Sequence, residues 1–236
     1  MSVRHKNEPH GQSTTGTLNK LRAAVLGAND GIVSIAGLVV GVAGATASRS
    51  AIFTAGVAGV LAGAISMAAG EYVSVSSQRD TERALLKKEK FEVENYPEEE
   101  LVELTGLYKA KGLSHATAMK VAKELTAKDV YRAHLDAELA INPDDLVNPW
   151  QAAISSALAF LAGAILPMLA IMLSSQDNRV AITFVSTLIA LSITGALSAK
   201  FGNAPARPAI LRVTAGGALA MIVTYGIGHI VGAAGL

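Results

Sequence analysis

The sequence predicts an all-α membrane protein, with five transmembrane helices and a cytoplasmic helical domain inserted between the second and the third. Two observations support this fold class. Hydrophobic residues make up 51% of the chain and charged residues only 17%, which is too apolar for an ordinary soluble domain. The charge is also concentrated, because 15 of the 19 acidic residues lie between Asp80 and Asp145. Apolar flanks that favour lipid thus enclose a polar centre that favours water.

Five stretches are long and apolar enough to cross a hydrocarbon core, which takes about 20 helical residues. They cover residues 21–46, 51–77, 150–174, 179–199 and 210–235. The residues before the first stretch have no apolar core and no cleavage site, so we interpret them as a flexible cytoplasmic tail and not as a signal peptide. The expected parts are this tail, transmembrane helices 1–2, the cytoplasmic acidic helical domain and transmembrane helices 3–5, at residues 1–20, 21–77, 78–148 and 149–236.

The basic residues predict the orientation, because Lys and Arg accumulate in the cytoplasmic segments of membrane proteins. Eighteen of the 20 lie in the tail up to Arg22, in the central domain or in the connection 199–212. Only Arg49 and Arg179 lie in the other two connections. The N-terminus and the central domain are therefore expected in the cytoplasm.

The central domain is expected to fold as helices. Residues 78–95 continue the second span without a helix breaker, and Pro97 then allows a turn. Residues 98–111 form a second helix, Ser114 caps a third, and residues 128–140 form a fourth. Acidic side chains of neighbouring helices can then face one another.

Asp30 and Glu71 are carboxylates inside predicted spans, where each costs at least ~2.5–3.5 kcal/mol. Asp30 lies only about two turns past Arg22, so it either reaches the membrane interface or faces an ion or proton pathway. Met67 shares a helix face with Glu71, and its thioether suits transition metals, although most methionines in membrane helices only fill apolar space. Asp30, Met67 and Glu71 are the candidate residues of a transport pathway.

The central domain contains two Glu-x-x-Glu pairs, Glu89 with Glu92 and Glu100 with Glu103. If their helices fold back antiparallel, the four carboxylates converge and repel one another unless a cation neutralises them. His134 and Glu138 lie one turn apart on the fourth helix and can add an imidazole and a carboxylate. The alternative is a solvated acidic face, which is the usual role of such charge runs.

The motif Gly27–Ser34, which contains Asp30, the motif Gly63–Ser74, which contains Met67 and Glu71, and the two Glu-x-x-Glu pairs together resemble a known family. Over residues 21–236 the chain resembles the vacuolar iron transporter family, in its bacterial or archaeal form. The resemblance implies a homodimeric exporter of Fe²⁺, and also of Mn²⁺, that exchanges metal for protons. Such a protein belongs to the prokaryotic inner membrane, or to the vacuolar membrane if its source is eukaryotic.

Site roles also follow from this resemblance. The ion path runs between subunits along transmembrane helices 1–2, where Asp30 and Met67 match lining positions. The cytoplasmic domain becomes a metal-binding domain whose ligands match Glu89, Glu92, Glu100, Glu103 and Glu138. Two departures stand out: His134 and Leu135 replace a methionine pair, and Gly59 replaces a pore glutamate.

Two other functions remain open at this point. A di-iron oxidase would need Glu-x-x-His pairs, which the sequence lacks, and a membrane-anchored metal sensor or scaffold would leave Asp30 and Glu71 without a role. The chain has no cysteine, which excludes disulfides and thiolate sites. We therefore expect no enzyme, no prosthetic group and no nucleic-acid partner. The expected partners are divalent metal ions, protons, the lipid bilayer and a second copy of the chain.

Overall fold

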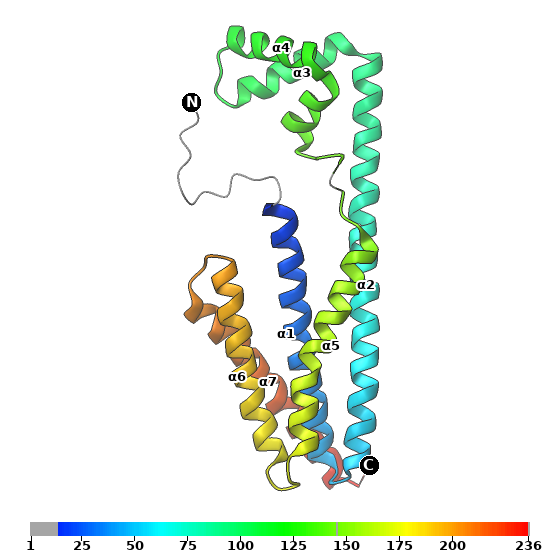
Figure 1. The fold of residues 1–236 in the computed structure, drawn as a ribbon, viewed down its shortest axis with the longest axis vertical. Helices are drawn as coiled ribbons and strands as arrows, with labels where there is room; N and C mark the ends of the chain where they lie inside the picture. The colour runs from blue at the N-terminus through cyan, green and yellow to red at the C-terminus, as the bar shows by residue number, and fades with distance from the viewer. Residues whose placement is uncertain (1–13, 145, 236) are drawn as a thin grey trace. The chain divides into compact units, whose positions relative to one another are not determined.

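The computed structural model describes residues 14–144 and 146–235, without the side chains of residues 14–23 (Figure 1). The chain forms two compact units, one made of Met1–Tyr72 with Pro149–Leu236 and the other of Val73–Asn148. We call them the apolar unit and the acidic unit. Of the expected flexible tail, residues 1–13 lie outside the described part, whereas residues 14–20 are already helical.

The apolar unit contains the helices α1 (Thr14–Ala45), α5 (Pro149–Leu173), α6 (Arg179–Phe201) and α7 (Ala206–Ala233), together with the first part of α2 (Arg49–Asn95). Each of these helices has a stretch long and apolar enough to span a membrane. The five predicted apolar helices are thus confirmed. Helix α7 begins four residues before the predicted 210, at Ala206.

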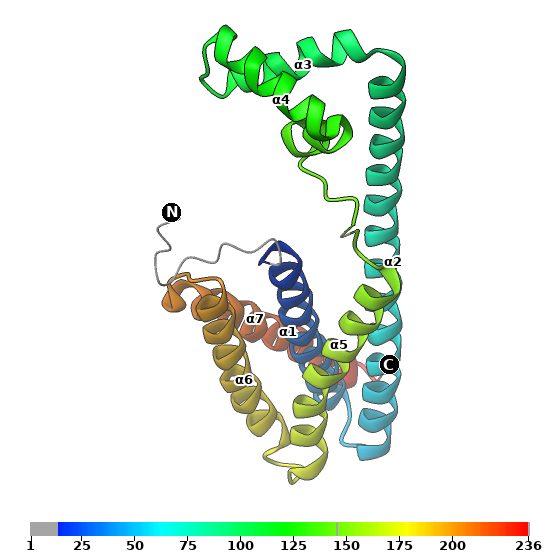
Figure 2. The same ribbon diagram turned by 45° about the horizontal axis from the view of Figure 1, so that its top comes forward.

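Helix α1 is the centre of the apolar unit and packs against α5, α6 and α7 (Figure 2). Glycines permit this packing, because a Cβ at Gly31 would collide with the backbone carbonyl of Phe160 on α5. A Cβ at Gly228 of α7 would likewise collide with the carbonyl of Gly41. Glycines of α1 such as Gly31 and Gly41 therefore allow close helix packing within one chain.

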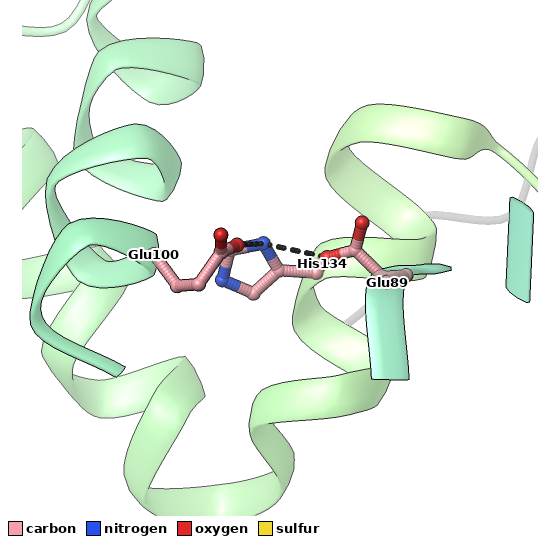
Figure 3. A group of neighbouring side chains, drawn as sticks. All are labelled: Glu89, Glu100 and His134. Atoms are coloured by element: carbon pink, nitrogen blue, oxygen red, sulfur yellow. Dashed lines mark ion pairs between the residues drawn. The ribbon is translucent and has the colours of Figure 1, made fainter. Parts of the chain in front are cut away.

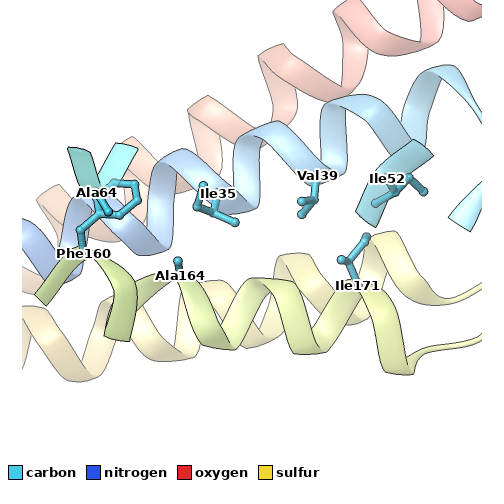
Figure 4. Close-up of a cluster of buried hydrophobic side chains, with 7 residues drawn as sticks. All are labelled: Ile35, Val39, Ile52, Ala64, Phe160, Ala164 and Ile171. Atoms are coloured by element: carbon cyan, nitrogen blue, oxygen red, sulfur yellow. The ribbon is translucent and has the colours of Figure 1, made fainter. Parts of the chain in front are cut away.

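The largest buried cluster of the apolar unit lies between α1, α2 and α5 (Figure 4). Ile35 and Val39 of α1 face Ala164 and Ile171 of α5. The ring of Phe160 fills the space left by Gly63, so α2 joins the cluster through a glycine–aromatic contact. Its buried members are Ile35, Val39, Ile52, Ala64, Phe160, Ala164 and Ile171.

Two arginines join the connections at one end of the apolar unit. Arg179, at the start of α6, is only 4% exposed and donates hydrogen bonds to the carbonyls of Thr46 and Ala47 after α1, at 3.1 and 3.2 Å. Arg49, at the start of α2, donates to the carbonyl of Ser174 after α5 at 3.0 Å. These bonds satisfy carbonyls beyond the helix ends that have no partner within a helix.

The acidic unit is built from the end of α2 and from α3 (Pro97–Ala110), α4 (His115–His134) and the π-helix η1 (Leu135–Leu139). Ser114 caps α4 as predicted, because its hydroxyl accepts a hydrogen bond from the Thr117 amide at 3.2 Å. Inside α4 the backbone of Asp129 is extended, so the helix is interrupted there. This interruption lies one residue inside the predicted fourth helix, 128–140, close to its predicted start.

Candidate metal centre

Three buried ligand-type side chains meet inside the acidic unit: Glu89 from α2, Glu100 from α3 and His134 from the end of α4 (Figure 3). Their exposed fractions are 3%, 6% and 0%. Nδ1 of His134 lies 3.0 Å from Oε1 of Glu89 and 3.3 Å from Oε2 of Glu100. One ligand atom from each residue falls within 4.8 Å of the others, which is a spacing that a single metal ion can bridge.

The local sequence explains how these side chains are brought together. Helix α2 ends at Asn95 and α3 begins with Pro97 at its first position, where a missing amide hydrogen costs nothing. The turn at Tyr96 places Glu100, in the first turn of α3, beside Glu89 near the end of α2. His134 is the last residue before the π-helix, an element often found at functional sites.

Several atoms of this centre lack the partners that buried polar atoms normally have. Oε1 of Glu89 and both ring nitrogens of His134 are buried and make no properly aligned hydrogen bond to any described residue. Buried groups of this kind cost free energy unless something satisfies them. Coordination of a cation by these atoms would remove that cost.

The electrostatics of the centre favour uncharged side chains. Burial, followed by the negative charges of Glu138 and Glu100, raises the pKa of Glu89 to about 7. Burial also raises the pKa of Glu100, with further contributions from Glu103 and Glu92. Burial lowers the pKa of His134, although Glu138 and Glu103 oppose the shift. A divalent cation would reverse this balance by stabilising two carboxylates and a neutral imidazole, the form that binds metal.

The remaining predicted residues of this site surround the buried three. Glu92 accepts a hydrogen bond from Lys88 at 2.9 Å and is partly exposed. Glu103 and Glu138 are exposed, and both are close enough to act electrostatically on the buried residues. The sequence treated all six residues alike, whereas the structure separates a buried centre from an acidic rim.

A second group of predicted residues lies in the apolar unit, along an open cavity of about 480 Å³ between α1, α2 and α7. Asp30 and Met67 both line this cavity, whereas Glu71 is not among its lining residues. The hydroxyl of Ser34 donates a hydrogen bond to Asp30 at 2.9 Å. The structure therefore brings two of the three predicted pathway residues together.

Sequence reasoning missed two residues of this cavity. Arg212 was counted as a basic residue of the connection 199–212, although it also lies inside the predicted span 210–235; in the structure it is on α7 and lines the cavity. Asn29 also lines it, and its Oδ1 is buried without a hydrogen-bond partner in the described part of the chain. In the sequence, the position of Asn29 next to Asp30 could have indicated that it belongs to the same site.

Comparison with known proteins finds similar sequences over most of the chain. The sequence profile of the VIT family matches residues 21–229. The chain is 45% identical over 221 residues to the "Vacuolar iron transporter" of Acanthamoeba castellanii, which covers 93% of this chain and 81% of that protein. It is 36% identical over 230 residues to the "Vacuolar iron transporter homolog 2" of Arabidopsis thaliana, covering 95% and 93%. Both relatives are eukaryotic, so they give no support to the bacterial or archaeal form that the sequence predicted.

Proposed function

The chain belongs to the vacuolar iron transporter family, and from this premise we propose that it exports Fe²⁺ from the cytoplasm in exchange for protons. Members of this family are transporters, so the chain is not an enzyme and the di-iron oxidase alternative is abandoned. The metal is the transported substrate. Mn²⁺ is proposed as a second substrate, because carboxylate and imidazole ligands accept several divalent ions.

The observation that carries the proposal is the buried group of Glu89, Glu100 and His134. Two carboxylates and an imidazole supply the oxygen and nitrogen ligands that ferrous iron accepts, and Glu92, Glu103 and Glu138 add negative charge around them. We assign to the acidic unit the capture of metal from the cytoplasm. The rim attracts the cation and the buried centre removes part of its hydration shell.

For the transport step we assign the metal path to the cavity lined by Asp30 and Met67. A carboxylate and a thioether on one cavity offer a hard and a soft ligand to a partly dehydrated cation. Protons are proposed to return through the same carboxylate and Glu71, which lies one turn from Met67 on α2. A metal sensor or scaffold would use neither carboxylate in the spans.

The proposed assembly is a homodimer through α1 and α2, with the N-terminus and the acidic unit in the cytoplasm. Leu61 and Ile65 support it, because they are 57% and 69% exposed on the apolar part of α2 and can contact lipid or a second copy. The proposed location is a prokaryotic inner membrane, in keeping with the bacterial or archaeal form, or a vacuolar membrane.

Reconstituted liposomes test this function directly. Fe²⁺ transport should require a pH gradient and should be lost in Asp30→Asn, which keeps the shape of the side chain and removes its charge. Glu89→Gln/Glu100→Gln should raise the KM for Fe²⁺ while preserving transport at saturating metal. Glu99→Gln, an exposed glutamate on the same helix as Glu100, is the matched control. Asp30→Asn liposomes that carry iron at the wild-type rate would refute the pathway.

A further inference from the structure

Arg212 shares a cavity with the carboxylate that we assign to metal transport. The cavity between α1, α2 and α7 is lined by nine residues, of which Asp30 and Arg212 are the charged ones. A second cavity of about 490 Å³, between α1, α6 and α7, also has Arg212 and Asn29 in its lining. Arg212 therefore lies at the junction of two open spaces in the apolar unit.

Neither charge has a direct partner of opposite sign among the side chains that the structure describes. No carboxylate oxygen lies within 4.0 Å of the Arg212 guanidinium, and Asp30 accepts a hydrogen bond only from the Ser34 hydroxyl. A guanidinium stays protonated at any physiological pH, so the cavity carries a permanent positive charge. The long side chain of arginine can move this charge toward Asp30 or away from it.

A permanent positive charge in a cation path must weaken metal binding. As an order-of-magnitude case we take a separation of about 8 Å between the two charges, which line one cavity without forming a direct ion pair. At that distance a unit positive charge lowers the affinity for a divalent ion about fivefold in water, and about a thousandfold at an effective dielectric constant of 20. The open cavity places the expected effect nearer the lower figure.

We propose that the guanidinium of Arg212 competes with metal ions for the carboxylate of Asp30. The structure has the two groups unpaired on one cavity; in the proposed cycle the guanidinium moves onto the Asp30 carboxylate in the absence of metal and withdraws when a divalent cation arrives. This competition keeps the affinity low enough for the metal to leave the path, which transport requires. It also disfavours monovalent cations, since an ion of charge +1 gains no electrostatic advantage over the guanidinium that it must displace. The inference rests on the proposed function and identifies a specificity-determining residue for it.

Kinetics of Mn²⁺ uptake into proteoliposomes test the proposal, because Mn²⁺ is stable in air. Arg212→Gln should lower the KM for Mn²⁺ at least about fivefold and should also lower kcat, since release becomes slower. Arg212→Lys keeps the charge and should stay near the wild-type values. Arg207→Gln, which removes a basic residue from the first turn of the same helix but not from the cavity, is the matched control. An unchanged KM in folded Arg212→Gln, or the same decrease in Arg207→Gln, would overturn the proposal.

Equilibrium binding separates this inference from the proposed function. In the Glu89→Gln/Glu100→Gln background, calorimetry of the full chain in detergent reports Mn²⁺ binding at the cavity. Arg212→Gln should tighten that binding at least about fivefold, and adding Asp30→Asn should cancel the gain. If the wild-type chain transports no metal but the variants show these changes in Mn²⁺ affinity, the proposed transport function is wrong and the proposed competition is supported. If Arg212→Gln leaves metal binding unchanged and instead removes stabilisation by anionic lipid, Arg212 is a headgroup anchor and the competition is wrong.

Discussion

At the scale of single residues, the buried centre depends on one carboxyl group whose protonation opposes metal binding. Glu89 is almost completely buried and adjoins the carboxylates of Glu100 and Glu138, and for these reasons its pKa is raised to about 7. At neutral pH the metal-free site is therefore close to the point where this proton is lost. Metal must displace the proton, so the affinity should fall as the pH drops below 7.

The same pKa predicts how the stability of the metal-free protein depends on pH. The pKa of Glu89 is about 7 in the folded chain, whereas its ordinary value, which we take for the unfolded chain, is 4.5. Between these two pH values the folded chain therefore binds more protons than the unfolded chain. This group's contribution to the free energy of unfolding is therefore largest below pH 4.5. It falls by about 3 kcal/mol as the pH rises through 7. In the presence of a chelator, Glu89→Gln should be more stable than the wild type at pH 8, as measured by thermal unfolding in detergent.

The control for this measurement is Glu99→Gln, which changes an exposed carboxylate. It should keep the wild-type pH dependence. If Glu89→Gln and Glu99→Gln unfold with the same pH profile as the wild type, then the pKa of Glu89 is not raised in the folded chain.

His134 should determine the preference among metals. Imidazole favours late transition metals such as Co²⁺, whereas carboxylates alone suit Mn²⁺ and harder ions. His134→Gln should therefore lower the ratio of Co²⁺ to Mn²⁺ affinity about tenfold, as measured by competition calorimetry on the full chain. His115→Gln, at the exposed start of α4, is the control and should leave the ratio unchanged. An equal loss of both metals in His134→Gln would mean that the imidazole only fills space.

The sequence could identify the ligand types at this site but not their burial. The Glu-x-x-Glu spacing and the pair His134 and Glu138 pointed to one carboxylate-rich region, and the structure gathers these residues there. Residue spacing on a regular helix treats His134 and Glu138 as equivalent neighbours. The π-helix that begins at Leu135 changes this register, so His134 is fully buried while Glu138 remains exposed. Such a local change of helix type has no simple signature in one sequence.

At the scale of elements, the orientation of His134 depends on the interruption of α4. The backbone of Asp129 is extended, and its carboxylate accepts a hydrogen bond from the Arg132 amide at 2.9 Å, which caps the segment that carries His134. A helix that continued straight through this position would point His134 in a different direction. Asp129 is exposed, so its role is conformational rather than one of core packing.

Asp129→Ala should remove the cap and favour a continuous helix, since alanine is the strongest helix former. We expect about 1 kcal/mol of lost stability and a weaker affinity for Mn²⁺, as measured by thermal unfolding and calorimetry. Asp129→Asn preserves a capping side chain and should keep the affinity. If Asp129→Ala binds metal as tightly as the wild type, the interruption does not position His134.

The apolar helices were predictable because membrane thickness sets a minimum length for a spanning apolar segment. A segment of that length and composition can be recognised in the sequence alone. Their polar ends were less predictable. Arg207 lies before the predicted start of the last span at residue 210, although the backbone is helical from Ala206. Arg212 lies inside that predicted span, but its charge led us to count it with the connection, and composition did not indicate that it lines the cavity of Asp30.

At the scale of the whole molecule, the contacts of two arginines explain the exceptions to the charge distribution that predicts the orientation. Arg49 and Arg179 are the two basic residues outside the segments assigned to the cytoplasm. Both donate hydrogen bonds to backbone carbonyls of the connections between α1 and α2 and between α5 and α6. Their positions thus have a structural reason, and they do not weaken the rule that basic residues accumulate in the cytoplasm.

Since α5 is long and apolar enough to span the membrane, we expect the acidic unit before it and the connection after it on opposite sides. Lys109 on α3 and Ser175 after α5 are both exposed, and the natural chain has no cysteine. Single cysteines at these two positions should react with a membrane-impermeant maleimide from opposite faces of sealed vesicles. The cysteine-free chain gives the background, and a second pair at Lys123 and Asp177 should repeat the pattern. In the proposed function the acidic unit captures metal on its own side of the membrane. The face from which the cysteine at position 109 is labelled is therefore the side from which metal is exported. Labelling of both positions from one face would require an even number of spans between them and would contradict the proposed path.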